Sequence, residues 1–166
     1  MTGVKTLHLL RHAKSDWDDR SLTDHERPLA PRGSKAAREL AERLKKKRIE
    51  VDLVLCSTAR RTRETLDLIR PALGSAEVKL EDDLYGASAE ELIERLRRVS
   101  KKVGAVLIIG HNPGIEEAAW LLLGPDRAPG HFPTGAMVSM RFAVEDWRSI
   151  KEGSAEPLGF ITPKDA

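Results

Sequence analysis

Residues 6–17, TLHLLRHAKSDW, join an apolar run to an abrupt cationic end. The run stops at Arg11 and His12, and Lys14 follows two residues later. Strands often end in polar side chains at a protein surface. Here, however, one strand ends in three groups that are cationic or become so on protonation. Such a cluster also indicates a binding site for an anion.

Composition limits the class of protein. The 166 residues are expected to form one domain, 1–166, with a substantial buried core. The net charge of only +2 gives no sign of a nucleic-acid or membrane partner. No apolar segment approaches the ~20 residues that span a bilayer, and the N-terminus makes a poor signal peptide. We therefore expect a cytoplasmic protein that binds neither nucleic acid nor membrane.

Apolar strands alternate with amphipathic helices along most of the chain. This order predicts an α/β fold, with a mostly parallel central sheet between two layers of helices. The last two strand-like segments have no long helix between them. They are expected to form a pair at the edge of the sheet, for which the antiparallel orientation is one option. Trp120 is expected to lie in the core. The expected strands are 4–11, 51–57, 76–82, 104–110, 136–144 and 157–163, and the expected helices are 31–48, 59–70, 88–99 and 113–124.

Three of these strands end in side chains that are suited to a ligand site. In open α/β sheets, ligands bind beyond the carboxyl ends of the strands. The first strand ends in Arg11 and His12, the second in Ser57 followed by three arginines, and the fourth in His111 just before a helix. Because parallel strands end at the same edge of a sheet, these groups are expected to meet there.

Imidazole and guanidinium groups together indicate phosphoryl transfer. Guanidinium forks bind phosphate oxygens bidentately at any working pH. One neutral imidazole can attack phosphorus and carry the phosphoryl group, while a second, protonated, stabilises charge on the oxygens. This scheme needs no metal and no cofactor. His8 and His12, four residues apart in a strand, lie ~13 Å from each other and are not expected to chelate one.

Two other phosphate chemistries are excluded by the motifs. The chain has no GxxxxGK[ST] nucleotide-binding loop. A cysteine phosphatase needs an arginine six residues after its cysteine, and the residue six positions after Cys56 is Thr62. Cys56, the only cysteine, is instead expected to be buried at a strand end, and a disulfide or Cys-based zinc site is excluded.

At this point the motifs resemble a known family. The stretch LLRHAKSDW (9–17) resembles the RHG motif of the histidine phosphatase superfamily, which includes the cofactor-dependent phosphoglycerate mutases. CSTARRTRET (56–65), GHNPG (110–114) and FPTGAMVSM (132–140) resemble its later motifs in the same order. In size and detail the chain is most similar to the bacterial SixA-type phosphohistidine phosphatases, which have a stretch like DHERPL (24–29).

The resemblance implies roles for individual residues. It makes His12 the nucleophile and Arg11, Arg61 and His111 the catalytic phosphate ligands, on an α/β/α sandwich that uses no metal or cofactor. Ala13 replaces the glycine of the motif, and Asp18 stands where mutases have asparagine. Further phosphate-binding candidates are Ser15, Thr134, Gly135 and Ala136, and the predicted neighbours of these ligands are Lys14, Asp18, Arg27 and Asn112. Trp17 is expected to wall the site.

The general acid distinguishes the possible substrates. Related mutases and broad phosphatases place an acid shortly before a glycine, and EDDLYG (81–86) offers Asp82 or Asp83. An alkoxide leaving group must be protonated as it departs, whereas phosphohistidine can leave as an imidazole already protonated on nitrogen. The short chain, without large inserts, suits a protein substrate.

The sequence therefore predicts a phosphatase for histidine-phosphorylated proteins, acting through a phosphohistidine intermediate. The first alternative is a phosphatase for small phosphoesters that uses Asp82 or Asp83 as its acid. The second is a non-catalytic phosphoprotein-binding module, which would need the arginines but not both histidines.

Overall fold

The computed structural model describes residues 3–163, and its elements match those expected from the sequence to within one or two residues at their ends. Four helices and six strands alternate up to the last two strands, with short 3₁₀ turns between them. The strands are β1 (Lys5–Arg11), β2 (Leu53–Ser57), β3 (Glu77–Glu81), β4 (Ala105–Gly110), β5 (Met137–Phe142) and β6 (Glu156–Ile161). The helices are α1 (Pro31–Lys47), α2 (Arg60–Ile69), α3 (Ala89–Arg97) and α4 (Gly114–Leu123).

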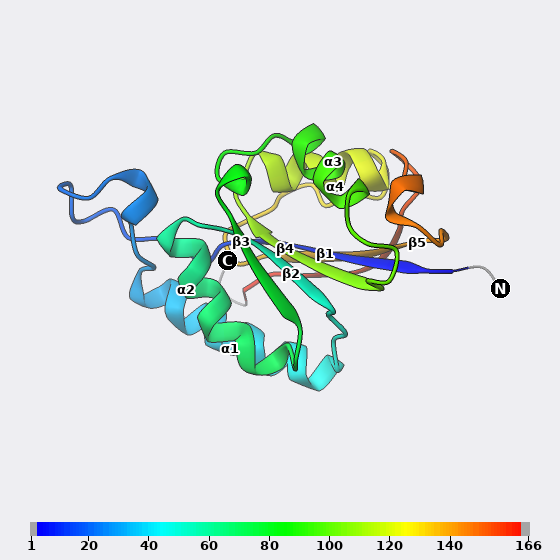
Figure 1. Cartoon of the computed structure of the whole chain (residues 1–166). Coiled ribbons are helices and arrows are strands. Elements are labelled where there is room, and N and C mark those ends of the chain that lie inside the picture. Colours follow the sequence, from blue (N-terminus) through cyan, green and yellow to red (C-terminus); the bar gives the residue numbers. More distant parts are fainter. Residues whose placement is uncertain (1–2, 164–166) are drawn as a thin grey trace.

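The six strands form one mixed sheet in the order β3-β2-β4-β1-β5-β6. The strands β3, β2, β4 and β1 run parallel to one another, β5 is antiparallel to β1, and β6 is antiparallel to β5. The predicted antiparallel pair is therefore confirmed, and of its two strands β6 forms the edge of the sheet, because β5 lies between β1 and β6. The twist of this sheet is visible in Figure 1.

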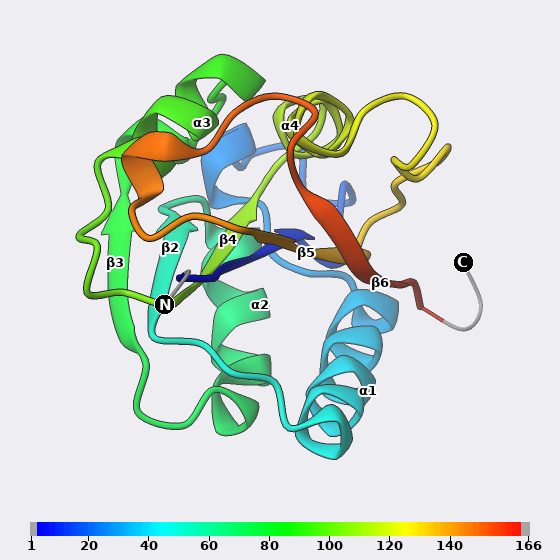
Figure 2. The ribbon, with the colours of Figure 1, turned by 90° about the vertical axis from the view of Figure 1, so that its right-hand side faces the viewer.

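Helices cover both faces of the sheet, so the fold is a three-layer α/β/α sandwich. Figures 1 and 2 show α3 and α4 on one face and α1 and α2 on the other. Side chains alternate between the two faces along β4, as they must in a strand. Val106 and Ile108 belong to the core under α3 and α4, and Leu107 and Ile109 belong to the core under α1 and α2. This burial on both faces explains the unbroken apolar run of β4.

One core assignment from the sequence is wrong. Trp120 on α4 keeps 51% of its surface exposed. The buried face of the helix is formed by residues at helical spacing, including Ile115, Ala118 and Leu122. Trp120 falls outside this stripe, and in a helix of such high apolar content the spacing, rather than residue size, decides which side is buried.

Trp147, in contrast, belongs to the core under α3 and α4. It is fully buried, and its indole nitrogen donates a hydrogen bond to the Val103 carbonyl at 2.7 Å.

None of the helices within residues 3–163 has the length and apolar content that a membrane span needs.

The first turn of α1 packs directly on the chain that follows β1. Pro31 begins the helix, a position where its missing N–H is no loss. A Cβ added to Gly33 would lie 2.1 Å from the Lys14 carbonyl oxygen. The same oxygen accepts a hydrogen bond from the Ala30 amide at 2.9 Å. The absence of a side chain at Gly33 therefore allows α1 to approach the segment just after His12.

Replacing Gly33 with alanine is expected to lower the free energy of unfolding by about 1–3 kcal/mol, the usual effect of overpacking, because backbone rather than a flexible side chain must move. Gly130→Ala is the matched control, since a Cβ there would meet nothing within 4 Å. Urea denaturation of both variants measures the difference. Equal stability of Gly33→Ala and Gly130→Ala would contradict the close approach.

Candidate active site

The register of three parallel strands brings the site together. Arg11 on β1 is paired with Gly110 on β4, so His12 and His111 each follow a paired residue at the same edge of the sheet. The His12 amide donates to the Gly110 carbonyl at 3.1 Å, which continues this pairing by one residue. The two imidazole rings lie 5.3 Å apart between centroids. Ser57 ends the neighbouring strand β2.

His12 is held with one ring nitrogen engaged. Its Nδ1 lies 2.7 Å from the Ala13 carbonyl oxygen. Because a carbonyl oxygen can only accept, Nδ1 carries the hydrogen, and in the neutral ring Nε2 keeps its lone pair. The Ala13 amide in turn donates to the Thr65 hydroxyl of α2 at 3.1 Å. The backbone and ring of the predicted nucleophile are thereby fixed from two sides.

His111 is oriented by Ser57 and Arg61. Its Nε2 lies 2.8 Å from the Ser57 hydroxyl, and its Nδ1 lies 3.4 Å from Arg61 Nη2. A guanidinium can only donate, so in the neutral ring Nδ1 accepts from Arg61 and Nε2–H donates to Ser57. The rings of Tyr85 and His111 are nearly perpendicular, with centroids 5.5 Å apart.

Three arginines approach the two imidazoles, and each has a buried nitrogen without a hydrogen-bond partner: Nε of Arg11, Nη1 of Arg27 and Nε of Arg61. Arg61 and Arg27 each expose only 6% of their surface. Buried N–H donors normally have partners, and an anion would supply them for several of these donors at once.

These residues line one open cavity of about 340 Å³. Among the predicted neighbours of the phosphate ligands, Lys14, Arg27 and Asn112 also line it, and Trp17 stands at its mouth with 70% of its surface exposed. The Arg27 guanidinium lies 3.2 Å from the centre of the Trp17 ring. The full lining is Arg11, His12, Lys14, Ser15, Trp17, Asp24, Arg27, Arg61, His111, Asn112 and Thr134.

The structure does not bring Gly135 and Ala136 into this cavity. The Gly135 amide donates to the carbonyls of both Arg11 and His12, at 3.1 and 2.9 Å, and the Ala136 amide donates to Pro133. Both backbone donors are therefore already used inside the fold. Gly135 adopts a left-handed φ of 78°, which lets its amide reach back to the end of β1.

The predicted acids also lie elsewhere. Asp82 accepts a hydrogen bond from the Thr58 hydroxyl at 2.6 Å, and with Asp83 it lines a separate hollow beside Arg95. Asp18 is exposed and outside the cavity. The neighbouring arginines of α2 are engaged away from the cavity too, Arg60 with Glu64 and Arg63 with the Thr58 carbonyl.

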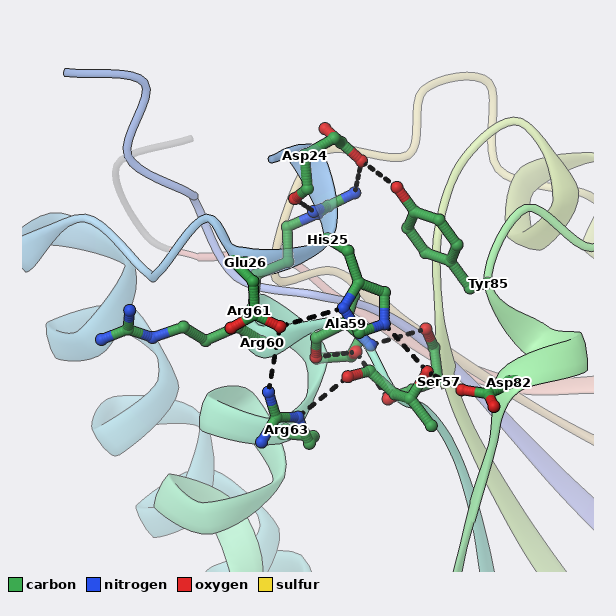
Figure 3. Close-up of polar contacts among 12 residues, drawn as sticks. Asp24, His25, Glu26, Ser57, Ala59, Arg60, Arg61, Arg63, Asp82 and Tyr85 are labelled. Atoms are coloured by element: carbon green, nitrogen blue, oxygen red, sulfur yellow. Dashed lines mark hydrogen bonds and ion pairs between the residues drawn. The ribbon is translucent and has the colours of Figure 1, made fainter. Parts of the chain in front are cut away.

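Sequence reasoning missed two residues of the site, Asp24 and Tyr85. Asp24 accepts hydrogen bonds from Arg61, Arg27 and the Tyr85 hydroxyl, as Figure 3 shows for Arg61 and Tyr85. Asp24 begins the DHERPL stretch, whose resemblance points to Arg27, and Tyr85 belongs to the EDDLYG stretch, whose resemblance points to Asp82 and Asp83. Only the fold shows that these two stretches meet.

Burial and positive charge keep both imidazoles neutral. Burial lowers the pKa of His12 to about 3, with smaller contributions from His111, Arg61 and Arg11 that oppose the effect of the hydrogen bond to Ala13. Burial, followed by the charge of Arg61, lowers the pKa of His111 to about 4. Neutral His12 has the protonation state that a nucleophile needs. A bound dianion would raise both values, because an opposite charge favours the imidazolium.

The family follows from comparison with known proteins. Residues 7–98 match the family model of the histidine phosphatase superfamily (branch 1). An uncharacterized protein of Mycobacterium tuberculosis is 36% identical over 166 residues, a match that covers 93% of this chain and 100% of the relative. This chain belongs to the histidine phosphatase superfamily. The family predicted from the motifs is confirmed, and membership implies phosphatase activity.

Solved structures extend the likeness to the whole chain. A protein from Nakamurella multipartitia, provisionally named phosphohistidine phosphatase SixA, has a TM-score of 0.84 and 31% identity, covering 98% of each chain. A mycobacterial glucosyl-3-phosphoglycerate phosphatase shares the fold at a TM-score of 0.63 and 17% identity, covering 90% of this chain and 96% of its own.

Within residues 3–163, no group of three or more His, Cys, Asp or Glu residues could hold a metal ion.

The depressed pKa values predict how stability changes with pH. An unfolded histidine has a pKa near 6.5, so between pH ~6.5 and 4 the unfolded chain binds more protons than the folded one at both His12 and His111. The free energy of unfolding is therefore expected to fall as the pH drops through this window, by up to about 1.4 kcal/mol per pH unit for each group.

Urea denaturation between pH 7 and 4.5, without phosphate in the buffer, measures this dependence. His12→Asn is expected to weaken it, whereas replacing the exposed His131 is the control for loss of a histidine. A His12→Asn profile parallel to wild type would show that His12 is not held neutral by the fold.

Proposed function

We propose that this phosphatase removes the phosphoryl group from phosphohistidine on a protein, in two steps and without a metal, with His12 as nucleophile. The observation that carries the proposal is the state of His12. Its Nδ1 is fixed to the Ala13 carbonyl, and its neutral ring lines a cavity with three incompletely bonded arginines. This is the arrangement that a covalent phosphoryl transfer requires.

In the first step, the lone pair of His12 Nε2 forms a bond to phosphorus as the bond from phosphorus to the substrate imidazole breaks. Arg11 and Arg61 hold the phosphoryl oxygens, and His111 donates to them once the bound dianion has raised its pKa and the ring is protonated. In the second step, water attacks phosphorus, the bond to His12 breaks, and inorganic phosphate leaves. Preorganised positive charge supplies much of the rate enhancement in such reactions.

The only carboxyl group that lines the cavity, within the described part of the chain, belongs to Asp24. The hydrogen bond from Tyr85, followed by the charge of Arg61 and its hydrogen bond, lowers the pKa of Asp24 to about 2. An ionised carboxylate has no proton to give to a departing alkoxide. A phosphoramidate tolerates the lack of a general acid better, since its imidazole can be protonated before it leaves. The state of Asp24 therefore supports phosphohistidine over an alkyl phosphate.

The position of the cavity suits a large substrate. Trp17 is exposed at its mouth, and the loop that carries Trp17 extends beyond the helical layers in Figure 1. The fold does not decide the substrate, because it is shared with phosphatases of a small molecule. The name of the Nakamurella protein, which refers to phosphohistidine, supports a protein substrate here as well.

Covalent trapping tests the nucleophile. With a ³²P-phosphohistidine protein as donor and EDTA present, wild-type protein is expected to acquire an acid-labile, alkali-stable label. His12→Ala is expected to acquire none and to lose at least about 1000-fold in turnover, as for loss of a nucleophile. His131→Ala is the matched control. Label that persists in His12→Ala would contradict the assignment, and binding of phosphoprotein without any turnover would favour the non-catalytic binding module.

Replacing Asp82 with asparagine separates the two substrate classes. Because Asp82 lies outside the cavity, Asp82→Asn is expected to change turnover of both a phosphoramidate and an alkyl phosphate by less than about 2-fold. Asp83→Asn is the parallel variant. A selective loss of about 10²–10⁴-fold on the alkyl phosphate alone would instead identify a general acid and a phosphatase for small esters.

A further inference from the structure

Both terminal nitrogens of Arg61, a residue proposed to bind the phosphoryl group, are already occupied. Arg61 Nη1 donates to the Asp24 carbonyl at 2.7 Å, and Nη2 donates to the Asp24 carboxylate at 3.1 Å. Only Nε is left without a partner. Nη2 also donates to His111 Nδ1 at 3.4 Å, so both of its hydrogens are used. A phosphate that binds the guanidinium bidentately needs Nη2, and it must therefore share this nitrogen with the Asp24 carboxylate or displace the carboxylate.

Of the two partners, Asp24 is the one that can move. Its side chain is 49% exposed, whereas that of Arg61 is only 8% exposed. Asp24 lies in a three-residue 3₁₀ turn, Asp24–Glu26, none of whose residues is buried. Its carboxylate can turn into water and keep its hydration, while Arg61 would leave a buried site. Charged groups leave water only at a high free-energy cost, so the exposed partner yields more easily.

Three donors from separate parts of the chain hold the carboxylate in the cavity. Arg61 comes from α2, Arg27 from the segment after the 3₁₀ turn, and the Tyr85 hydroxyl from the connection between β3 and α3. Figure 3 shows the Asp24 side chain between Arg61 and Tyr85. A carboxylate bound by two guanidiniums and a hydroxyl resembles the way an anionic ligand would be bound at the same place.

We propose that the Asp24 carboxylate is an internal competitor for the phosphoryl group: it binds Arg61 Nη2, aligns the guanidinium, and yields this nitrogen when the substrate binds. This inference rests on the proposed function and adds a consequence to it. An anion near bound phosphate repels it, so Asp24 also weakens the binding of product phosphate and favours its release.

Calorimetric titration with inorganic phosphate tests this directly, without depending on turnover. Asp24→Asn removes the charge and keeps the size of the side chain, and it is expected to bind phosphate at least 10-fold more tightly than wild type. Glu26→Gln removes the same charge from the same turn, but Glu26 contacts His25 and Arg63 rather than Arg61. It is expected to change phosphate affinity by less than about 2-fold, which separates direct competition from a general effect of charge.

A second variant covers the case in which Asp24→Asn does not fold. Tyr85→Phe removes one of the three donors and keeps the carboxylate, so it is expected to tighten phosphate binding by a smaller factor, about 2–5-fold. Structures of wild type with and without phosphate add a geometric measurement: the carboxylate is expected to leave Arg61 only when phosphate is bound.

These experiments distinguish failure of this inference from failure of the proposed function. Unchanged or weaker phosphate binding in Asp24→Asn, with wild type binding phosphate and labelled at His12, would overturn the competitor and leave the phosphatase intact. Tightening in Glu26→Gln equal to that in Asp24→Asn would also overturn it. If wild type neither binds phosphate nor becomes labelled, both proposals fail.

Discussion

The parallel pairing of β1 with β4 is the constraint on which the site depends. It aligns Arg11 with Gly110, and the residue after each of them is a histidine. The backbones of His12 and His111 cannot then separate without breaking the ladder at the centre of the sheet. β2 adds Ser57 on the far side of β4, and α2, which starts three residues after Ser57, brings Arg61 to the same edge. Geometry that a flexible loop could not hold is thus set by backbone hydrogen bonds.

This arrangement concentrates positive charge in the cavity, which suits the binding of a phosphoryl group. Two imidazoles and three guanidiniums converge in a partly buried cavity, and within the described chain Asp24 is the only carboxylate lining it. The imidazoles respond by staying neutral, with pKa values of about 3 and 4. The guanidiniums cannot lose their charge, so the site attracts anions strongly. An internal carboxylate reduces that charge until a substrate arrives.

The fold and the site answer different questions about function. Family and fold establish a phosphatase of the histidine phosphatase superfamily, and proteins with different substrates share the same sandwich. What bears on the substrate is local: an ionised Asp24 without a proton to donate, Asp82 and Asp83 in another hollow, and an open cavity beside an exposed tryptophan. In our proposal, the carboxylates bear on the leaving group, which would receive no proton from the protein, and the open cavity bears on the size of the substrate.

The sequence by itself determined the order of strands and helices, the family, and four side chains that meet at one edge of the sheet. It could do so because apolar periodicity and strand-end motifs are local, and parallel strands bring their ends together by rule. The sequence could not decide the exposure of Trp120, which depends on which stripe of a uniformly apolar helix faces the sheet. Nor could it show that the Gly135 and Ala136 amides are used within the fold, or that Asp24 and Tyr85 meet at Arg61. Those contacts join segments far apart in the chain, and only tertiary packing decides which of their side chains lie within a hydrogen bond of one another.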